Sequence, residues 1–337
     1  MVKKIILVIG SGSIAKRHIM NLKNLFPSNA VGCLSSSGRL LTVDEMGCDF
    51  VYSDFAEALK FKPYFAIIAS PATHHIDHAH QLLSANIPVL IEKPLSSSLN
   101  LVENSKQLLW SHKDKIEIAY NLRYLPACSI LKKMLDEKII GTVSNVLIDV
   151  GQYLPEWRLN SDYTKTVSAQ KALGGGVLLE LSHDLDYSVW LFGQVEEVYC
   201  VMMNTGQLVV DVEDNVSAII KFKNGPLATV HMDFLQRFPS RTCKIIGTLG
   251  TIIWDVLNNT IVLYTSTKEV KTIYTDSSYN KNDMYLHQLI HFEKMVSLSL
   301  KPRVGLEHAF YILYLVEALK RSAQSKQSIF LDNGWYS

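Results

Sequence analysis

One short segment limits what this chain can fold into more than any other. Residues 10–15 read Gly-Ser-Gly-Ser-Ile-Ala, directly after the apolar run 5–9 and before apolar residues at helical spacing. In this pattern the first glycine permits a tight turn, the second lets the backbone approach a pyrophosphate, and the alanine keeps helix and strand close. Free N–H groups at the start of the helix also attract phosphate. We therefore predict a dinucleotide site rather than an ordinary glycine-rich turn, with contacts at Gly10, Gly12, Ser13 and Ile14.

The order of apolar and amphipathic segments predicts two domains. Up to residue 121 short apolar runs alternate with amphipathic stretches, which is typical of βαβ units and a parallel sheet. Residues 195–275 instead show the alternation of an antiparallel sheet, and two amphipathic helices are expected at 283–298 and 306–324. We predict an α/β protein with a dinucleotide-binding domain at 1–122 and a second α/β domain, with a mostly antiparallel sheet, at 123–337.

Composition narrows the class of partner. Lys and Arg number 33 and Asp and Glu 32, so the net charge of +1 gives no general attraction to nucleic acid or anionic lipid. The five cysteines are scattered without metal-binding spacing, and no apolar stretch approaches the roughly 20 residues of a membrane helix. The basic, apolar start fits a buried strand better than a signal peptide. We expect a cytoplasmic protein with a small-molecule partner and no nucleic acid or membrane partner.

The loop after the second expected strand bears on the choice of cofactor. An NAD site usually has an acidic residue about 20 positions after the glycine motif, where it holds the ribose 2′-hydroxyl. Residues 34–39 here read Leu-Ser-Ser-Ser-Gly-Arg and contain no carboxylate. Ser35, Ser36 and Arg39 suit a 2′-phosphate, so NADP is slightly favoured over NAD. A solvated loop whose arginine contacts nothing is the alternative.

Another candidate segment, Glu92-Lys93-Pro94, comes at the carboxyl end of an expected parallel strand, the edge where ligands bind in open α/β sheets. The proline favours an extended Lys93, whose ammonium group can stabilise a developing alkoxide. Taken alone, the motif is better explained as a surface lysine before a turn proline.

Six segments together resemble the Gfo/Idh/MocA family of sugar and polyol oxidoreductases. They are GSGSIA (10–15), ASPATHH (69–75), EKP (92–94), YNLRYLP (120–126), GGG (174–176) and ELSHDLDYSVWLFG (180–193). The resemblance implies a Rossmann domain followed by an α/β domain with a large open sheet, whose outer face serves a homodimer or homotetramer. It also implies NAD(P)-dependent oxidation or reduction of a sugar, sugar derivative or cyclitol.

The resemblance also assigns residues. The lysine of the EKP motif falls on Lys93 and the motif histidine on His183, while Asn121 and Arg123 match an N-x-R pair at the entrance to the second domain. The family commonly has an aspartate four residues before the histidine; Leu179 stands there, and we take Glu180 as the shifted equivalent. The implied cofactor contacts of these motifs are Ser70, Pro71, His75, Glu92 and Lys93.

These assignments imply hydride transfer assisted by a base. His183 is the expected base, because an imidazole both accepts and returns a proton near neutral pH. Lys93 would hold the same oxygen, and Glu180 would orient the imidazole or bind a neighbouring hydroxyl. A metal held by Glu180, His183, Asp184 and Asp186 is disfavoured, because the two aspartates cannot share one helical face.

The substrate stretch leaves alternatives open. Trp157 and Arg158, with Lys93, Arg123 and His183, are the expected substrate contacts, and the stretch suits a sugar carrying a carboxylate or phosphate, such as one from surface-glycan synthesis. An exposed loop with a buried tryptophan explains it equally well. A dinucleotide-binding sensor without turnover and an NAD-dependent glycosidase remain alternative functions. Alternating apolar positions such as Val198, Val201 and Ile219 suggest an apolar sheet face for oligomerisation.

Overall fold

The computed structural model describes residues 3–158 and 161–331, which form two compact units. Described residues up to Asn121, together with Lys281–Leu313, make the first unit. The second comprises Leu122–Asn280 and the described residues from Tyr314 onward. The first unit therefore combines the chain up to Asn121 with a later segment, and the expected boundary at residue 122 stays a prediction.

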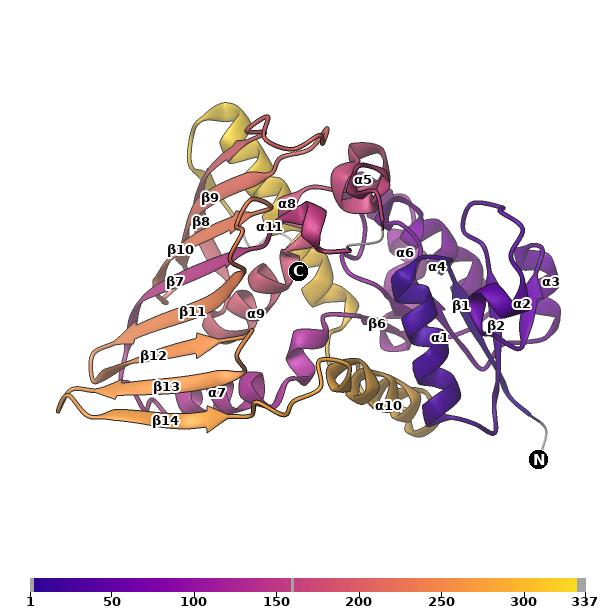
Figure 1. Cartoon of the computed structure of the whole chain (residues 1–337), viewed down its shortest axis with the longest axis horizontal. Coiled ribbons are helices and arrows are strands. Elements are labelled where there is room, and N and C mark those ends of the chain that lie inside the picture. The colour runs from indigo at the N-terminus through magenta and orange to yellow at the C-terminus, as the bar shows by residue number, and fades with distance from the viewer. Residues whose placement is uncertain (1–2, 159–160, 332–337) are drawn as a thin grey trace. The chain divides into compact units, whose positions relative to one another are not determined.

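A six-stranded parallel sheet forms the centre of the first unit (Figure 1). Its strand order, β3-β2-β1-β4-β5-β6, reverses direction between β1 and β4, so their carboxyl ends define the crevice where such sheets bind ligands. The strands are β1 (Ile5–Ile9), β2 (Ala30–Leu34), β3 (Phe50–Tyr52), β4 (Phe65–Ile68), β5 (Val89–Ile91) and β6 (Ile116–Ile118). The helices are α1 (Ser13–Leu25), α2 (Val43–Met46), α3 (Phe55–Lys60), α4 (His75–Ser84), α5 (Leu99–Glu103), α6 (Lys106–Ser111) and α10 (Asp283–Leu298).

Burial explains why these strands read as unbroken apolar runs. Both faces of a parallel sheet are covered, and every residue from Ile6 to Ile9 is fully buried. Helix α10 lies beside α1 in Figure 1, and its Leu289, Phe292 and Met295 enter the core formed by β1, β2 and β4. This packing is why residues 281–313 belong to the first unit.

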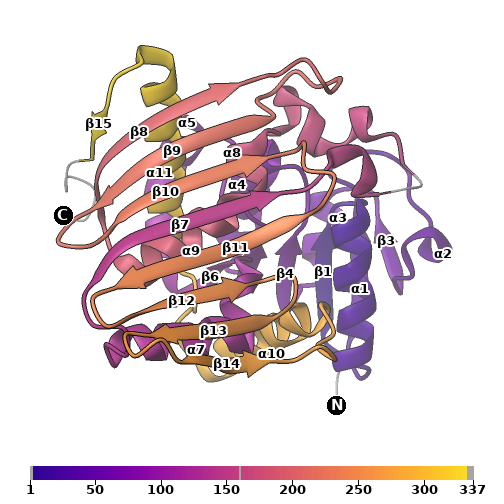
Figure 2. The same cartoon turned by 60° about the vertical axis from the view of Figure 1, so that its left-hand side comes forward.

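The second unit is built on a nine-stranded sheet, seen face-on in Figure 2. Its order is β14-β13-β12-β11-β7-β10-β9-β8-β15, and only β7 and β10 pair in parallel among the described strands. The strands are β7 (Val143–Gly151), β8 (Val195–Met203), β9 (Asn215–Phe222), β10 (Leu227–Asp233), β11 (Ser240–Gly247), β12 (Gly250–Asp255), β13 (Thr260–Thr265), β14 (Val270–Thr275) and β15 (Ile329–Phe330).

Helices cover one face of that sheet. Tyr187 of α9 packs edge-on against Trp254 of β12, with ring centroids 5.1 Å apart, and Phe192 meets Phe222 in the same way. The helices are α7 (Pro126–Asp136), α8 (Val177–Glu180), α9 (Ser182–Phe192) and the part of α11 (Leu306–Ser325) from Tyr314 onward.

The other face of the sheet is exposed and partly apolar. Val201 and Ile219 are 50% and 46% exposed, as expected, whereas Val198 is fully buried against the helices and does not belong to this face. Its assignment there was wrong because residues 198 and 201 are an odd number of positions apart and so point to opposite faces of a strand.

Candidate active site

The glycine turn fits a pyrophosphate. Gly10 has φ +128°, and a Cβ there would lie 2.3 Å from the carbonyl oxygen of Ala69, so the turn requires glycine. Gly12 begins α1 with an extended backbone; among the described residues no side chain caps the helix, and no atom lies within 4 Å of a Cβ built on Gly12. The open space and the uncapped N–H groups of Ser13 and Ile14 are the arrangement that binds a phosphate.

Arg39, the cation expected to meet a 2′-phosphate, pairs with a carboxylate that the sequence analysis overlooked. Its Nη2 lies 2.6 Å from Oε1 of Glu45 on α2, and Nη1 lies 3.3 Å from Oε2. The hydrogen bond from Arg39 lowers the pKa of Glu45. Lys16 of α1 acts on the same carboxyl group, so the loop after β2 carries charges of both signs. Ser35 Oγ accepts a hydrogen bond from the N–H of Ser37, and Ser36 is half-buried beside it.

The segment after β4 forms a closed set of contacts. His75 is buried; its Nδ1 lies 2.8 Å from the carbonyl oxygen of Pro94 and its Nε2 lies 2.9 Å from that of Ser70. Burial lowers the pKa of His75, while these carbonyls and Glu92 oppose the shift. The structure shows the contacts of His75 with these two backbone segments. Its contact with a nicotinamide stays a prediction. Pro71 begins the short 3-10 turn Ala72–His74 and is half-exposed.

The EKP turn follows β5, two strands from β1 in the sheet order. Glu92 accepts a hydrogen bond from the buried imidazole of His18 on α1, with 2.7 Å between Oε1 and Nε2. Lys93 is half-exposed, and the Lys93–Pro94 peptide is cis. The glycine turn, the Ser70 segment and Lys93 thus follow β1, β4 and β5, three neighbouring strands whose carboxyl ends share one edge.

In the second unit, a glycine run leads into the helices that carry the other expected catalytic residues. Gly176 has φ +106°, and a Cβ there would lie 2.5 Å from Oε1 of Glu213. That oxygen accepts the N–H of Leu178 at the start of α8. Glu180 ends α8 and His183 is the second residue of α9; both are half-buried. The conformational freedom of Gly176 therefore brings Glu213 against the helix that precedes His183.

The two aspartates after His183 form buried ion pairs. Asp184 lies 2.6 Å from Nη2 of Arg241 on β11, and Asp186 lies 2.8 Å from Nε of Arg123. Arg123 is 4% exposed, and its guanidinium lies 4.3 Å from the centre of the Trp190 ring. The structure thus joins Arg123 to α9, and its contact with substrate stays a prediction. Within the described ranges, no group of three His, Cys, Asp or Glu side chains is arranged to hold a metal.

Trp157 and Arg158 differ in their surroundings. The Trp157 indole donates to the carbonyl oxygen of Gln152 at 3.1 Å and packs edge-on against Phe234. Arg158 is exposed, next to residues 159–160, which lie outside the described part of the chain. The tryptophan is therefore anchored, and the arginine is the more accessible of the two.

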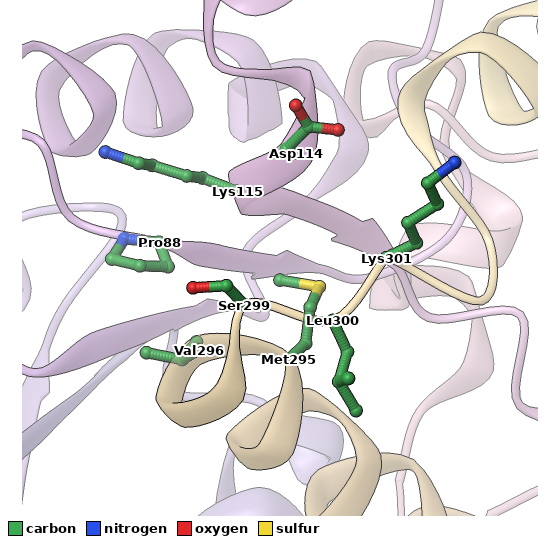
Figure 3. Close-up of a pocket in the computed structure, with 8 residues that line it drawn as sticks. All are labelled: Pro88, Asp114, Lys115, Met295, Val296, Ser299, Leu300 and Lys301. Atoms are coloured by element: carbon green, nitrogen blue, oxygen red, sulfur yellow. The ribbon is translucent and has the colours of Figure 1, made fainter.

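A separate cavity of about 430 Å³ opens in the first unit (Figure 3). Pro88 precedes β5, and Asp114 and Lys115 precede β6, so this cavity lies at the amino ends of the strands, the edge opposite to Lys93. Its remaining lining comes from the end of α10 and the chain after it, namely Met295, Val296, Ser299, Leu300 and Lys301. It is not part of the candidate active site.

Two family models match this chain. The model described as an oxidoreductase family with an NAD-binding Rossmann fold matches residues 4–120, and the GFO/IDH/MocA C-terminal domain matches residues 129–253. The chain belongs to the Gfo/Idh/MocA family of oxidoreductases. The match confirms the resemblance found in the sequence, and the predicted α/β fold with a Rossmann domain is also confirmed.

Several known proteins are similar to this chain over most of their length. The uncharacterized oxidoreductase YrbE of Bacillus subtilis is 26% identical over 266 residues, covering 76% of this chain and 75% of the relative. The myo-inositol 2-dehydrogenase of Thermotoga maritima is 25% identical over 346 residues, covering 96% and 98%. A solved levoglucosan dehydrogenase, in complex with NADH and levoglucosan, matches with a TM-score of 0.84 and 20% identity over 98% of this chain and 99% of that one.

Three residues of the site escaped the sequence analysis. His18 and Glu92 are 74 positions apart, and a histidine inside a helix gives no sign of a distant partner. Glu213 was missed because its contact with Gly176 joins distant positions of the chain and exists only in the folded protein. Glu45 was the most accessible to sequence reasoning, because it lies only six residues after Arg39. No helix of the described residues is both long and apolar enough to span a membrane.

Proposed function

We propose that this protein transfers a hydride between a nicotinamide dinucleotide and a hydroxyl or keto carbon of a sugar, sugar derivative or cyclitol. One observation carries the proposal. The open glycine turn follows β1 and the Lys93 turn follows β5, so both lie at the same edge of one parallel sheet. The names of the relatives, a myo-inositol dehydrogenase and a levoglucosan dehydrogenase, support a polyhydroxylated substrate.

The proposed roles follow from the chemistry of the residues. Gly10, Gly12 and the first N–H groups of α1 bind the pyrophosphate, and the bound nicotinamide accepts or returns the hydride. Lys93 donates a hydrogen bond to the reacting oxygen and stabilises its negative charge. His183 removes the hydroxyl proton in oxidation and returns it in reduction, and Glu180 orients the imidazole or binds a neighbouring hydroxyl.

The cofactor choice turns on Arg39. The absence of a carboxylate at the end of β2 favours NADP over NAD, and Arg39 is the cation that would meet the 2′-phosphate. Its pairing with Glu45 opposes this preference, because a 2′-phosphate would have to share the guanidinium with a second anion. Comparative titration with NADPH and NADH, followed by nucleotide fluorescence, decides between the two.

The remaining features of the proposal concern substrate charge and assembly. The exposed Arg158 supports a sugar with a carboxylate or phosphate, as in surface-glycan metabolism, which a substrate panel with and without anionic groups tests. The exposed apolar positions on β8 and β9, including Val201 and Ile219, support a homodimer or homotetramer through the nine-stranded sheet. The proposed location of the enzyme is the cytoplasm. Ile219→Asp should shift the mass measured by light scattering toward the monomer.

The decisive experiment compares wild type with Lys93→Ala. Nucleotide titration is followed by an absorbance screen of sugars, polyols and their acidic derivatives, with Lys115→Ala as the control because Lys115 lies at the opposite edge of the same sheet. We expect Lys93→Ala to reduce kcat at least about 100-fold while nucleotide affinity changes little. Nucleotide binding without turnover on any substrate would favour a sensor, and turnover of glycosides without net cofactor consumption would favour an NAD-dependent glycosidase.

A further inference from the structure

We propose that His18 is a positioning residue for Lys93 and acts through Glu92. The inference rests on the function proposed above for Lys93. It starts from one buried contact: His18 Nε2 lies 2.7 Å from Glu92 Oε1, the His18 side chain is inaccessible to solvent, and that of Glu92 is 11% exposed. A carboxylate accepting a bond of this length inside a protein is held much more firmly than one at the surface.

The contact reaches Lys93 through the other oxygen of the same carboxylate. Glu92 Oε2 accepts the backbone N–H of Lys93 at 3.3 Å, and the N–H of Glu92 donates to the carbonyl oxygen of Ile68 at 2.9 Å. Both carboxylate oxygens are therefore engaged, one by α1 and one by the residue whose ammonium group is to meet substrate. Rotation of the Glu92 carboxylate would release the Lys93 backbone at the point where its side chain is aimed.

The opposite flank of the turn is held independently. His75 of α4 contacts the carbonyl oxygens of Pro94 and Ser70, so the chain is fixed immediately after Lys93 as well as before it. The half-exposed Lys93 thus lies between two segments that the core immobilises. Such support on both sides keeps a catalytic group within the few tenths of an ångström that catalysis requires.

Stability alone explains His18 poorly. Its Nδ1 is buried without a hydrogen-bond partner among the described residues, so its hydrogen bond there is made through Nε2, toward Glu92. Burying such a polar pair is often no better for stability than burying apolar side chains of the same size. The Glu92 contact links the helix expected to bind the pyrophosphate with the turn expected to act on substrate. An apolar residue at position 18 would fill the same space without making that link.

The test separates positioning from binding and folding. His18→Leu removes the imidazole at similar volume, and His18→Gln keeps a side-chain N–H at similar reach. We expect kcat to fall at least about tenfold in the leucine variant, while the Kd for NADH or NADPH and the KM for sugar change less than about threefold. The glutamine variant should recover most of kcat. His291→Leu is the matched control, because His291 forms a similar pair with Glu117 in the same unit, at 3.1 Å, and should leave kcat unchanged.

Other outcomes are equally informative. Folded His18→Leu protein with wild-type kcat, or with loss confined to nucleotide affinity, overturns the proposal; if that variant does not fold, His18→Asn, too short to reach Glu92, is measured instead. A readout without turnover is the rate at which a small acylating reagent modifies Lys93, mapped by mass spectrometry. A changed modification rate in His18→Leu but not in His291→Leu supports positioning of Lys93, even if the wild-type protein turns over no sugar. Absence of sugar turnover would defeat only the proposed function. An unchanged modification rate in His18→Leu overturns the positioning role of His18.

Discussion

Replacing Arg123 tests whether this residue binds substrate or holds the second unit together. Its guanidinium makes two contacts with the Asp186 carboxylate, of 2.8 and 3.0 Å, and the two side chains are 4% and 0% exposed. Arg123→Met breaks this buried ion pair by removing one of its two charges, which costs about 3–5 kcal/mol. At about 2–4 °C per kcal/mol for a unit of 150–250 residues, the Tm should fall by about 6–20 °C.

The matched control is Arg237→Met. Arg237 also pairs with a carboxylate, that of Glu156 at 3.2 Å, and also lies over an aromatic ring, that of Tyr153, but its side chain is 70% exposed. A pair of this kind contributes about 0–1 kcal/mol, so its removal should lower the Tm by less than about 4 °C. The Tm of both variants is measured by calorimetry. Because the two arginines have similar partners, the difference between the two Tm shifts reports mainly the effect of burial.

A second variant checks the cause of the Arg123 effect. Asp186→Leu added to Arg123→Met removes the second charge of the pair and should restore part of the lost stability, whereas two independent losses would add. If Arg123→Met instead keeps the wild-type Tm and raises only the KM for sugar, the structural reasoning is refuted and the sequence-based assignment to substrate binding stands.

Further predictions concern the glycine turn, α8 and the cofactor loop. Gly12→Ala should weaken nucleotide binding at least about tenfold in a fluorescence titration with little change in Tm, whereas Gly10→Ala should lower the Tm, because its Cβ would meet a backbone carbonyl. Burial raises the pKa of Glu213, so stability should fall as pH rises from the unfolded-state to the folded-state pKa; Glu213→Gln should abolish this fall in Tm measured from about pH 4 to pH 8. Glu45→Gln should raise the affinity for NADPH relative to NADH, because it frees the Arg39 guanidinium.

Most of the first unit could be predicted because its signals are local. Buried parallel strands are continuous apolar runs, and Asp54 accepts the Glu57 N–H as a helix cap, as its position before Phe55 suggests. The amphipathic stretch at 98–110 forms two short helices, α5 and α6, separated near Ser105. Strand β3 gives a weak signal, because it is only three residues long and buries only Tyr52 fully.

What escaped prediction depends on contacts between distant parts of the chain. The apolar face of α10 is visible in the sequence, but nothing there says that it packs on a sheet formed more than 200 residues earlier. The site behaves in the same way. The motifs located Lys93 and His183, whereas the partners of Glu92 and Asp186 lie 74 and 63 positions away and follow from the folded chain alone.

The helix that carries His183 shows how such distant partners bear on catalysis. Asp184 and Asp186 are two positions apart, so their side chains leave α9 about 200° apart around its axis. Each is fully buried and meets a different arginine, Arg241 on β11 or Arg123 in the turn before α7. Two ion pairs on opposite sides resist rotation of the helix, and the direction of His183 follows that rotation. The two aspartates, which the sequence disfavours as metal ligands, therefore have partners that hold the helix of the expected base against rotation.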